Sequence, residues 1–207
     1  MTNLHVPKKL AALIATGAMF AAVPFAAQAD SLRYSYWQLG YVGVDVDGLS
    51  DQVDGWAVGL SYEVTDRVFI DAGYTDVGAT EAGIDIDEQD LSLGVGYAYP
   101  ISPNNDLIGR IGYVRAEGEV EGFGSGSDDG YALGVGWRTR PLDAIEFEAA
   151  VNYVDLSDAG DTTSFGLGAF WYFTPQVALA VSGAYNDDAT SYLIGVRGTW
   201  GRTGSRD

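Results

Sequence analysis

The 207-residue chain has no cysteine and only one histidine, and both scarcities limit its chemistry. Without cysteine it can form no disulfide and offers no thiolate nucleophile or ligand. The histidine, His5, lies close to the first residue, and the two lysines, Lys8 and Lys9, follow it. A general base that works near neutral pH is most easily a histidine. We therefore expect no enzymatic activity and no cofactor.

Positive charge is also scarce. The chain has 11 Lys and Arg against 29 Asp and Glu, which gives a formal net charge of −18. Nucleic-acid binding requires a basic surface that neutralises phosphates, so we expect no nucleic-acid partner. After residue 29 no run approaches the ~18 apolar residues of a transmembrane helix. No segment there has a convincing 3.6-residue period, so we expect essentially no helix in this part of the chain.

The first 29 residues have the features of an export signal. Lys8 and Lys9 precede an apolar run at 10–29 that ends in Ala-Gln-Ala. This order predicts a signal peptide at 1–29, cleaved after Ala29. Pro24 and the shortness of the run argue against a membrane anchor. Because cleavage removes two lysines and no acid, it changes the formal charge from −18 to −20.

The rest of the chain is rich in alternating segments. In 90–100, large residues (Leu91, Leu93, Val95, Tyr97) alternate with small or polar ones, which is the period of a β-strand. Long acidic connections alternate with short ones that often contain proline, as in outer-membrane barrels. We predict an all-β, antiparallel up-and-down transmembrane β-barrel over 30–200, with ten strands (eight as the alternative) and a short periplasmic tail at 201–207. The ten segments are 31–44, 54–64, 67–76, 88–99, 106–116, 130–140, 144–154, 163–173, 176–185 and 190–200.

The large side chains are too many for a barrel interior. Eight strands already leave an interior just wide enough to fill with side chains, so the bulky face must point outward. An apolar exterior of this size suits lipid and not a soluble monomer. Aromatic residues form two bands around an aliphatic middle, as expected at two bilayer interfaces. The predicted girdle residues are Trp37, Trp56, Tyr62, Tyr97, Tyr99, Tyr131, Trp137, Tyr153, Trp171, Tyr192 and Trp200.

Short glycine-aromatic motifs carry a family resemblance. They are Y-x-Y-x-x-x-G-Y at 34–41, D-G-W at 54–56 and R-I-G-Y at 110–113. With them, the chain resembles the small outer-membrane β-barrel proteins of Gram-negative bacteria, OmpA-like or OmpX-like in plan. It is most similar to a family of about this length in xanthomonad-type bacteria. The resemblance implies a place in the outer membrane and recognition by the barrel-assembly machinery through the last strand.

The alternation also predicts which charged residues face the lumen. Acidic and arginine side chains on the inner face suit an internal ion-pair network that braces the barrel. The alternative is a narrow, cation-preferring pore, because acids outnumber arginines. Gln38 and Asn152 would share this face. The predicted lumen residues are Glu63, Asp71, Asp90, Arg110, Arg138, Glu146, Glu148 and Arg197.

The acidic loops offer weak metal-site candidates. Hard oxygen ligands suit divalent cations, but neither loop follows the spacing of a calcium-binding EF-hand. The candidate ligands are Asp45, Asp47, Asp51, Asp85 and Asp87, and Glu88 and Asp90 extend the second group. The alternative is that acidic loops in a chain without lysine after residue 29 reflect a saline habitat.

These observations favour a non-enzymatic, monomeric envelope barrel with acidic extracellular loops. We expect its partners to be outer-membrane lipid, lipopolysaccharide and divalent cations. Two other functions stay open at this point. One is the narrow diffusion pore, and the other is an exported soluble barrel that binds an apolar ligand.

Overall fold

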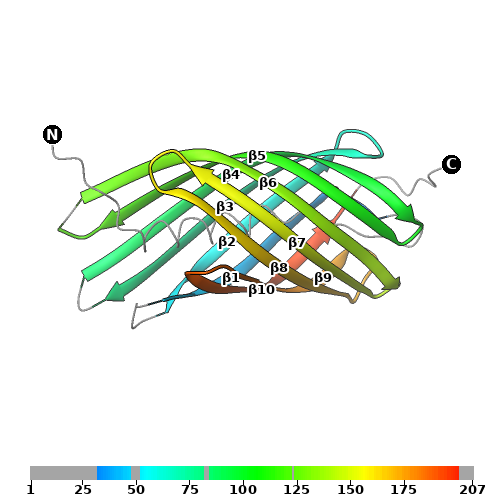
Figure 1. Cartoon of the computed structure of the whole chain (residues 1–207). Helices are drawn as coiled ribbons and strands as arrows, with labels where there is room; N and C mark the ends of the chain where they lie inside the picture. Colours follow the sequence, from blue (N-terminus) through cyan, green and yellow to red (C-terminus); the bar gives the residue numbers. More distant parts are fainter. Residues whose placement is uncertain (1–31, 48–51, 82–83, 123, 201–207) are drawn as a thin grey trace.

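The computed structural model describes residues 32–47, 52–81, 84–122 and 124–200. They form one closed antiparallel barrel in which each strand pairs with the next in the chain, and β1 pairs with β10 (Figure 1). This confirms the predicted ten-stranded all-β fold. The strands are β1 (Tyr36–Val46), β2 (Val53–Glu63), β3 (Val68–Glu81), β4 (Ile84–Ser102), β5 (Asn105–Val120), β6 (Gly124–Leu142), β7 (Ile145–Leu156), β8 (Gly160–Tyr172), β9 (Val177–Tyr185) and β10 (Ala189–Thr199).

Among the described residues, no helix is long and apolar enough to cross a membrane.

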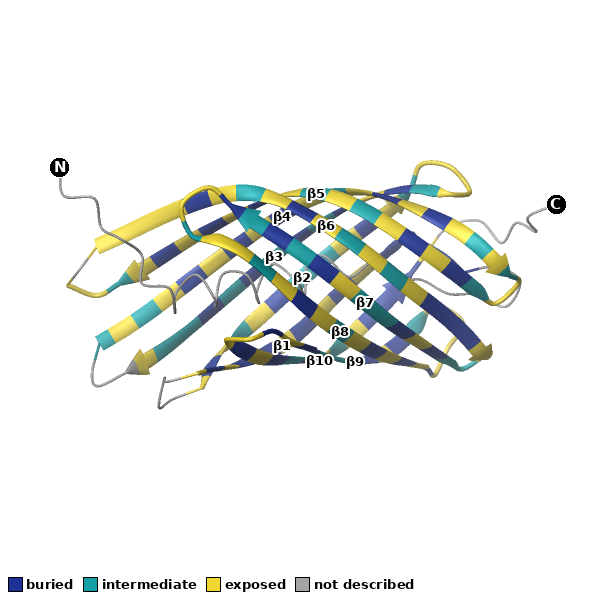
Figure 2. Cartoon of the chain, in the orientation of Figure 1, coloured by how far each residue is buried: buried dark blue, intermediate teal, exposed yellow. Residues whose placement is uncertain are grey.

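The two faces of the barrel wall differ as the alternation predicts (Figure 2). On β2, Leu60 is 52% exposed, whereas the adjacent Ser61 is 3% exposed. The outer face carries large apolar residues. The inner face carries small, polar and charged residues together with buried apolar ones such as Val42, Phe170 and Leu193. Of the eleven predicted girdle residues, nine are exposed on the outer face. The other two, Tyr153 and Tyr192, are half-buried against Tyr131 and Tyr41, with ring centroids 6.2 and 6.3 Å apart.

Two segments predicted as loops are strands. We expected connections at 76–87 and 117–130, but β3 and β4 pair as far as Glu81 and Ile84, and β5 and β6 pair as far as Val120 and Gly124. These two hairpins reach furthest at one end of the barrel (left in Figure 1). They are acidic or glycine-rich and lie beyond the aromatic band, so the lipid-facing alternation that marks a strand is lost there. Gly122 and Gly124 have φ values of 79° and 103° at the tip between β5 and β6, where a side chain would be strained.

The first predicted strand also begins later than expected. We placed it at 31–44, but β1 begins at Tyr36, and residues 32–35 are not in a strand. Leu32, Tyr34 and Ser35 are nevertheless almost fully buried. The backbone carbonyl of Ser35 accepts a hydrogen bond of 3.1 Å from the Trp200 amide. The segment therefore lies at the barrel end that holds the short turns, against the end of the last strand.

The interior is filled over much of its height. One apolar cluster follows β1, β2, β3, β8, β9 and β10, and a second follows β5, β6 and β7 at the hairpin end. Beside the first cluster, polar side chains occupy the inner faces of β3 to β7. The predicted signal peptide, the tail at 201–207 and Asp51 lie outside the described residues.

Candidate functional site in the barrel interior

The middle of the lumen holds an ion pair between β3 and β5. The Arg110 guanidinium donates to both carboxylate oxygens of Asp71, and its Nε lies 2.9 Å from Oδ2. The ion pair lies over Gly94 of β4, where a side chain would collide with both partners. Two parallel hydrogen bonds fix the relative position of the groups as well as their charge.

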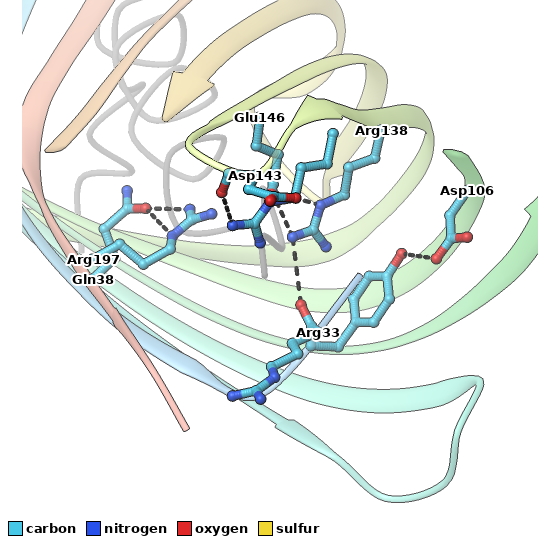
Figure 3. Close-up of polar contacts among 9 residues, drawn as sticks. Arg33, Gln38, Asp106, Arg138, Asp143, Glu146 and Arg197 are labelled. Carbon is cyan, nitrogen blue, oxygen red and sulfur yellow. Dashed lines mark hydrogen bonds and ion pairs between the residues drawn. The ribbon is translucent and has the colours of Figure 1, made fainter. Parts of the chain in front are cut away.

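A second ion pair lies closer to the short turns. Both side chains are fully buried, and Arg138 of β6 donates from Nε and Nη2 to Oε1 of Glu146 on β7, at 2.8 and 2.6 Å. Nη2 also lies 3.4 Å from the carbonyl oxygen of Arg33 (Figure 3). Arg138 thus joins the barrel wall to the segment before β1.

Residues 32–35, which we call the inner segment, close this end of the lumen through Tyr34. The Tyr34 hydroxyl donates to Oδ2 of Asp106 on β5 at 2.8 Å. The Tyr34 ring stacks on Phe69 of β3 with centroids 4.7 Å apart. The Arg138 guanidinium lies 4.7 Å from the centroid of the same ring, at cation–π distance. Contacts to three strands hold the inner segment inside the barrel.

Arg197 of β10 occupies the opposite side of this layer. Its Nε donates to Oε1 of Gln38 on β1 at 3.1 Å, so the contact crosses the β1–β10 pairing. Its guanidinium also lies 3.9 Å from the Phe170 ring centroid and 4.6 Å from that of Tyr36. Nearer the turn between β6 and β7, Arg140 donates to the Asp143 carbonyl, and its guanidinium lies 4.6 Å from the Tyr172 ring centroid.

Two ion pairs connect four of the eight predicted lumen residues within the described part of the chain. Asp71 pairs with Arg110, and Glu146 pairs with Arg138. Glu63 accepts a hydrogen bond of 3.4 Å from the Ser35 hydroxyl of the inner segment. Glu148 and Asn152 are buried on the same inner face of β7.

Asp90, which the ion-pair hypothesis made a candidate partner for an arginine, makes no ion pair with a described residue. Neither of its carboxylate oxygens has a hydrogen-bond partner among the described residues. The reason is geometric: Asp90 lies opposite Thr75 and Ala116 of the flanking strands, whereas Arg110 is opposite Gly96 of β4 and reaches Asp71.

The metal-site candidates are dispersed. Asp45 and Asp47 are exposed, and so are Asp85 and Asp87 on the outer face of the β3–β4 hairpin. Oδ1 of Asp85 accepts a hydrogen bond of 2.7 Å from Thr80. No group of three or more Asp, Glu, His or Cys residues within the described ranges could hold a metal ion. The alternation along β4 explains this, because it separates Asp85 and Asp87 from Glu88 and Asp90.

Sequence reasoning missed the inner segment and its partners. Tyr34 precedes the clear alternation of β1, so nothing in the pattern indicated that it enters the lumen. Asp106 could have been found, because it has the same parity on 106–116 as the inward-facing Arg110. Phe69 has the parity of Asp71 in the same way, although an apolar residue on an inner face suggests packing more than a polar site.

Comparisons with known proteins identify a sequence family and several solved structures of similar fold. Residues 11–173 match the sequence family described as outer membrane protein beta-barrel domain. No curated protein matches the chain significantly. Among solved structures, the chain is similar to Ail, the attachment invasion locus protein of Yersinia pestis, at 16% identity and a TM-score of 0.43, over 80% of this chain and 99% of that one. It is also similar to the KdgM porin, at 12% identity and a TM-score of 0.44, over 79% of this chain and 99% of that one. A third similar structure is the translocator domain of the autotransporter NalP from Neisseria meningitidis, at 13% identity and a TM-score of 0.46, over 80% of this chain and 88% of that one.

Proposed function

The chain belongs to the outer membrane protein β-barrel domain family, and from this we propose that it is a non-enzymatic barrel with a closed lumen. Its function lies at the extracellular hairpins, where it meets ions, lipopolysaccharide or other surfaces. The inner segment is the observation that carries this proposal. Tyr34 is 1% exposed and contacts β3, β5 and β6 from inside the barrel.

The layer around the inner segment supports a lumen without a through path. Arg138, Glu146 and Arg197 are all fully buried, and Phe170 and Tyr36 cover the Arg197 guanidinium. Ten strands are also few compared with the 16–18 strands that are typical of open porins. A solute would have to displace both the aromatic ring of Tyr34 and a buried ion pair.

The projecting hairpins support a role at the surface. The β3–β4 and β5–β6 hairpins continue as paired strands beyond the aromatic band, so they present ordered backbone and exposed acidic side chains. Charged residues on such surfaces attract cations over about 8 Å at physiological salt. Divalent cations that bridge these acids to lipopolysaccharide phosphates are the partners we expect, and the chain acts as a monomer.

Planar-bilayer conductance of the refolded protein tests the closed lumen. We expect no reproducible single-channel steps from the wild-type chain. Reproducible, cation-selective conductance steps that are lost in Glu146→Gln or Arg110→Gln would contradict the closed lumen and support the narrow pore. A heat-dependent change in gel migration, measured on the same sample, reports that the barrel is folded in either case.

A further inference from the structure

The hairpin-proximal half of the lumen contains two acidic residues that form no ion pair with any described residue. Glu88 and Asp90 follow each other on the inner face of β4, and each is 1% exposed. None of their four carboxylate oxygens has a hydrogen-bond partner among the described residues. Burying an ionised carboxylate without a partner costs several kcal/mol, so two adjacent ones require compensation.

The next inward residue of β4 supplies an independent observation. Ser92 is 1% exposed, and its hydroxyl oxygen also has no hydrogen-bond partner within the described part of the chain. A buried hydroxyl is normally paired. The three side chains therefore form a row of oxygen atoms along one strand, with Cα atoms roughly 6.6 Å apart at each step. Thr75, fully buried on β3, lies opposite Asp90 and places a further hydroxyl beside the row.

Among the described residues, no cationic side chain lies opposite this row on the flanking strands. Val77 lies opposite Glu88 on β3, while Ala116 and Val114 lie opposite Asp90 and Ser92 on β5. Arg110, on the same side of the lumen, uses its guanidinium on Asp71. The two acidic side chains thus lie between mostly apolar neighbours on the flanking strands.

We propose that Glu88 and Asp90 form an internal binding site for one divalent cation, that the Ser92 hydroxyl holds a water molecule bound to this ion, and that calcium is the ion that fits best. Two carboxylates balance the double charge. Calcium accepts about six to eight oxygen ligands in flexible geometry, with carboxylates bound through one or both oxygens. The four carboxylate oxygens can supply up to four of these, and water molecules, one of them held by Ser92, can supply the others. Magnesium demands stricter octahedral geometry and keeps several waters, so it binds this site more weakly.

This site differs from the acidic loop surface in its consequences. Surface acids attract many cations weakly, whereas an enclosed pair binds one ion and couples it to folding, because the unfolded chain does not hold the two carboxylates together. Calcium at 100 times its dissociation constant would raise the folded-to-unfolded ratio about 100-fold. The effect requires a folded barrel and is independent of whether the lumen conducts.

Calcium titration of the protein refolded in detergent with a chelator tests the proposal. The wild-type barrel should bind one calcium ion by calorimetry, and its urea-unfolding midpoint should rise in calcium relative to chelator. Glu88→Gln/Asp90→Asn should abolish both effects. Asp85→Asn/Asp87→Asn is the matched control, because it removes the same charge from the outer face of the same strand. This control should keep the saturable binding of one calcium ion that the wild type shows.

Three results would overturn the internal site. The first is a wild-type barrel without saturable calcium binding, which is also the result expected if the two carboxylates share a proton. The second is unchanged binding by the Glu88→Gln/Asp90→Asn variant. The third is an equal loss of binding in the Asp85→Asn/Asp87→Asn control. If the luminal double variant does not fold, Ser92→Ala replaces it, and a calcium affinity at least several-fold below that of the wild type supports the site. Unchanged affinity in Ser92→Ala counts against it. Gel migration confirms folding for each variant separately.

Discussion

The rings of Tyr34 and Phe69 lie face to face inside the barrel, with an angle of 10° between their planes. Tyr34 comes before the first strand and Phe69 lies near the start of the third. The stack thus ties a chain segment outside the sheet to the sheet itself. Because Tyr34 also bonds Asp106, the packing and the hydrogen bond of this ring can be tested separately.

Removing the Tyr34 ring should destabilise the barrel much more than removing its hydroxyl. Tyr34→Ala leaves a cavity beside Phe69, and truncating a buried aromatic residue typically costs about 3–5 kcal/mol. Tyr34→Phe keeps the stack but leaves Asp106 without this donor, at a cost of about 1–3 kcal/mol. Urea unfolding followed by gel migration measures both. Tyr99→Phe, at an exposed site, should change little; an equal effect at Tyr99 would contradict the role of the inner segment.

Gly96 of β4 should tolerate no side chain. A Cβ atom there would overlap the Phe69 ring, whereas at Gly59 of β2 nothing lies within 4 Å. We expect Gly96→Ala to lower stability by about 1–3 kcal/mol through overpacking and to displace Phe69 from Tyr34. Gly59→Ala should be close to neutral. Refolding yield and the unfolding midpoint of the two variants give the comparison, and equal behaviour would show that Phe69 adjusts freely.

The buried pair Arg138–Glu146 should be much more sensitive to loss of one partner than of both. Arg138→Met leaves the fully buried Glu146 uncompensated, and breaking a buried pair costs about 3–5 kcal/mol. The double variant Arg138→Met/Glu146→Gln has neither the cation nor the buried carboxylate, so we expect it to recover most of the lost stability. A double-mutant cycle of urea-unfolding free energies measures the coupling. Additive effects of the two changes would mean that the pair does not interact in the folded barrel.

The outer face should reject charge according to depth. Leu133 lies on the lipid-facing side of β6 within the aliphatic band, two residues from the girdle residue Tyr131. Leu133→Arg should cost about 2–4 kcal/mol near the bilayer midplane. Glu119→Arg, exposed on the projecting part of β5, should fold normally. Refolding into lipid vesicles at several urea concentrations distinguishes the two, and similar costs at both positions would contradict the assigned membrane band.

The sequence predicted the parts of the structure that lipid imposes. Trp37, Leu91 and Trp137 had to face a bilayer, so period-2 alternation revealed their strands and faces. It did not reveal where the β3–β4 and β5–β6 hairpins end, because beyond the bilayer neither face needs to be apolar. Contacts between distant parts of the chain were also invisible. Parity placed Arg138, Glu146 and Asp90 inside. The register places Arg138 opposite Glu148, so only the side-chain contacts show that Arg138 reaches Glu146. The register also shows that Asp90 lies between Thr75 and Ala116.

The pairing of β1 with β10 differs from every other pairing in the barrel, since it joins residues as far apart as Gln38 and Arg197, 159 positions along the chain. The other pairings join consecutive strands and can form locally. Closing a long loop carries a large entropic cost before its contacts form. Until that closure, β1 and β10 are open strand edges that can pair with other chains. The Gln38–Arg197 contact therefore joins the two edges at the seam, and barrel closure is the stage of assembly at which the chain is most exposed to aggregation.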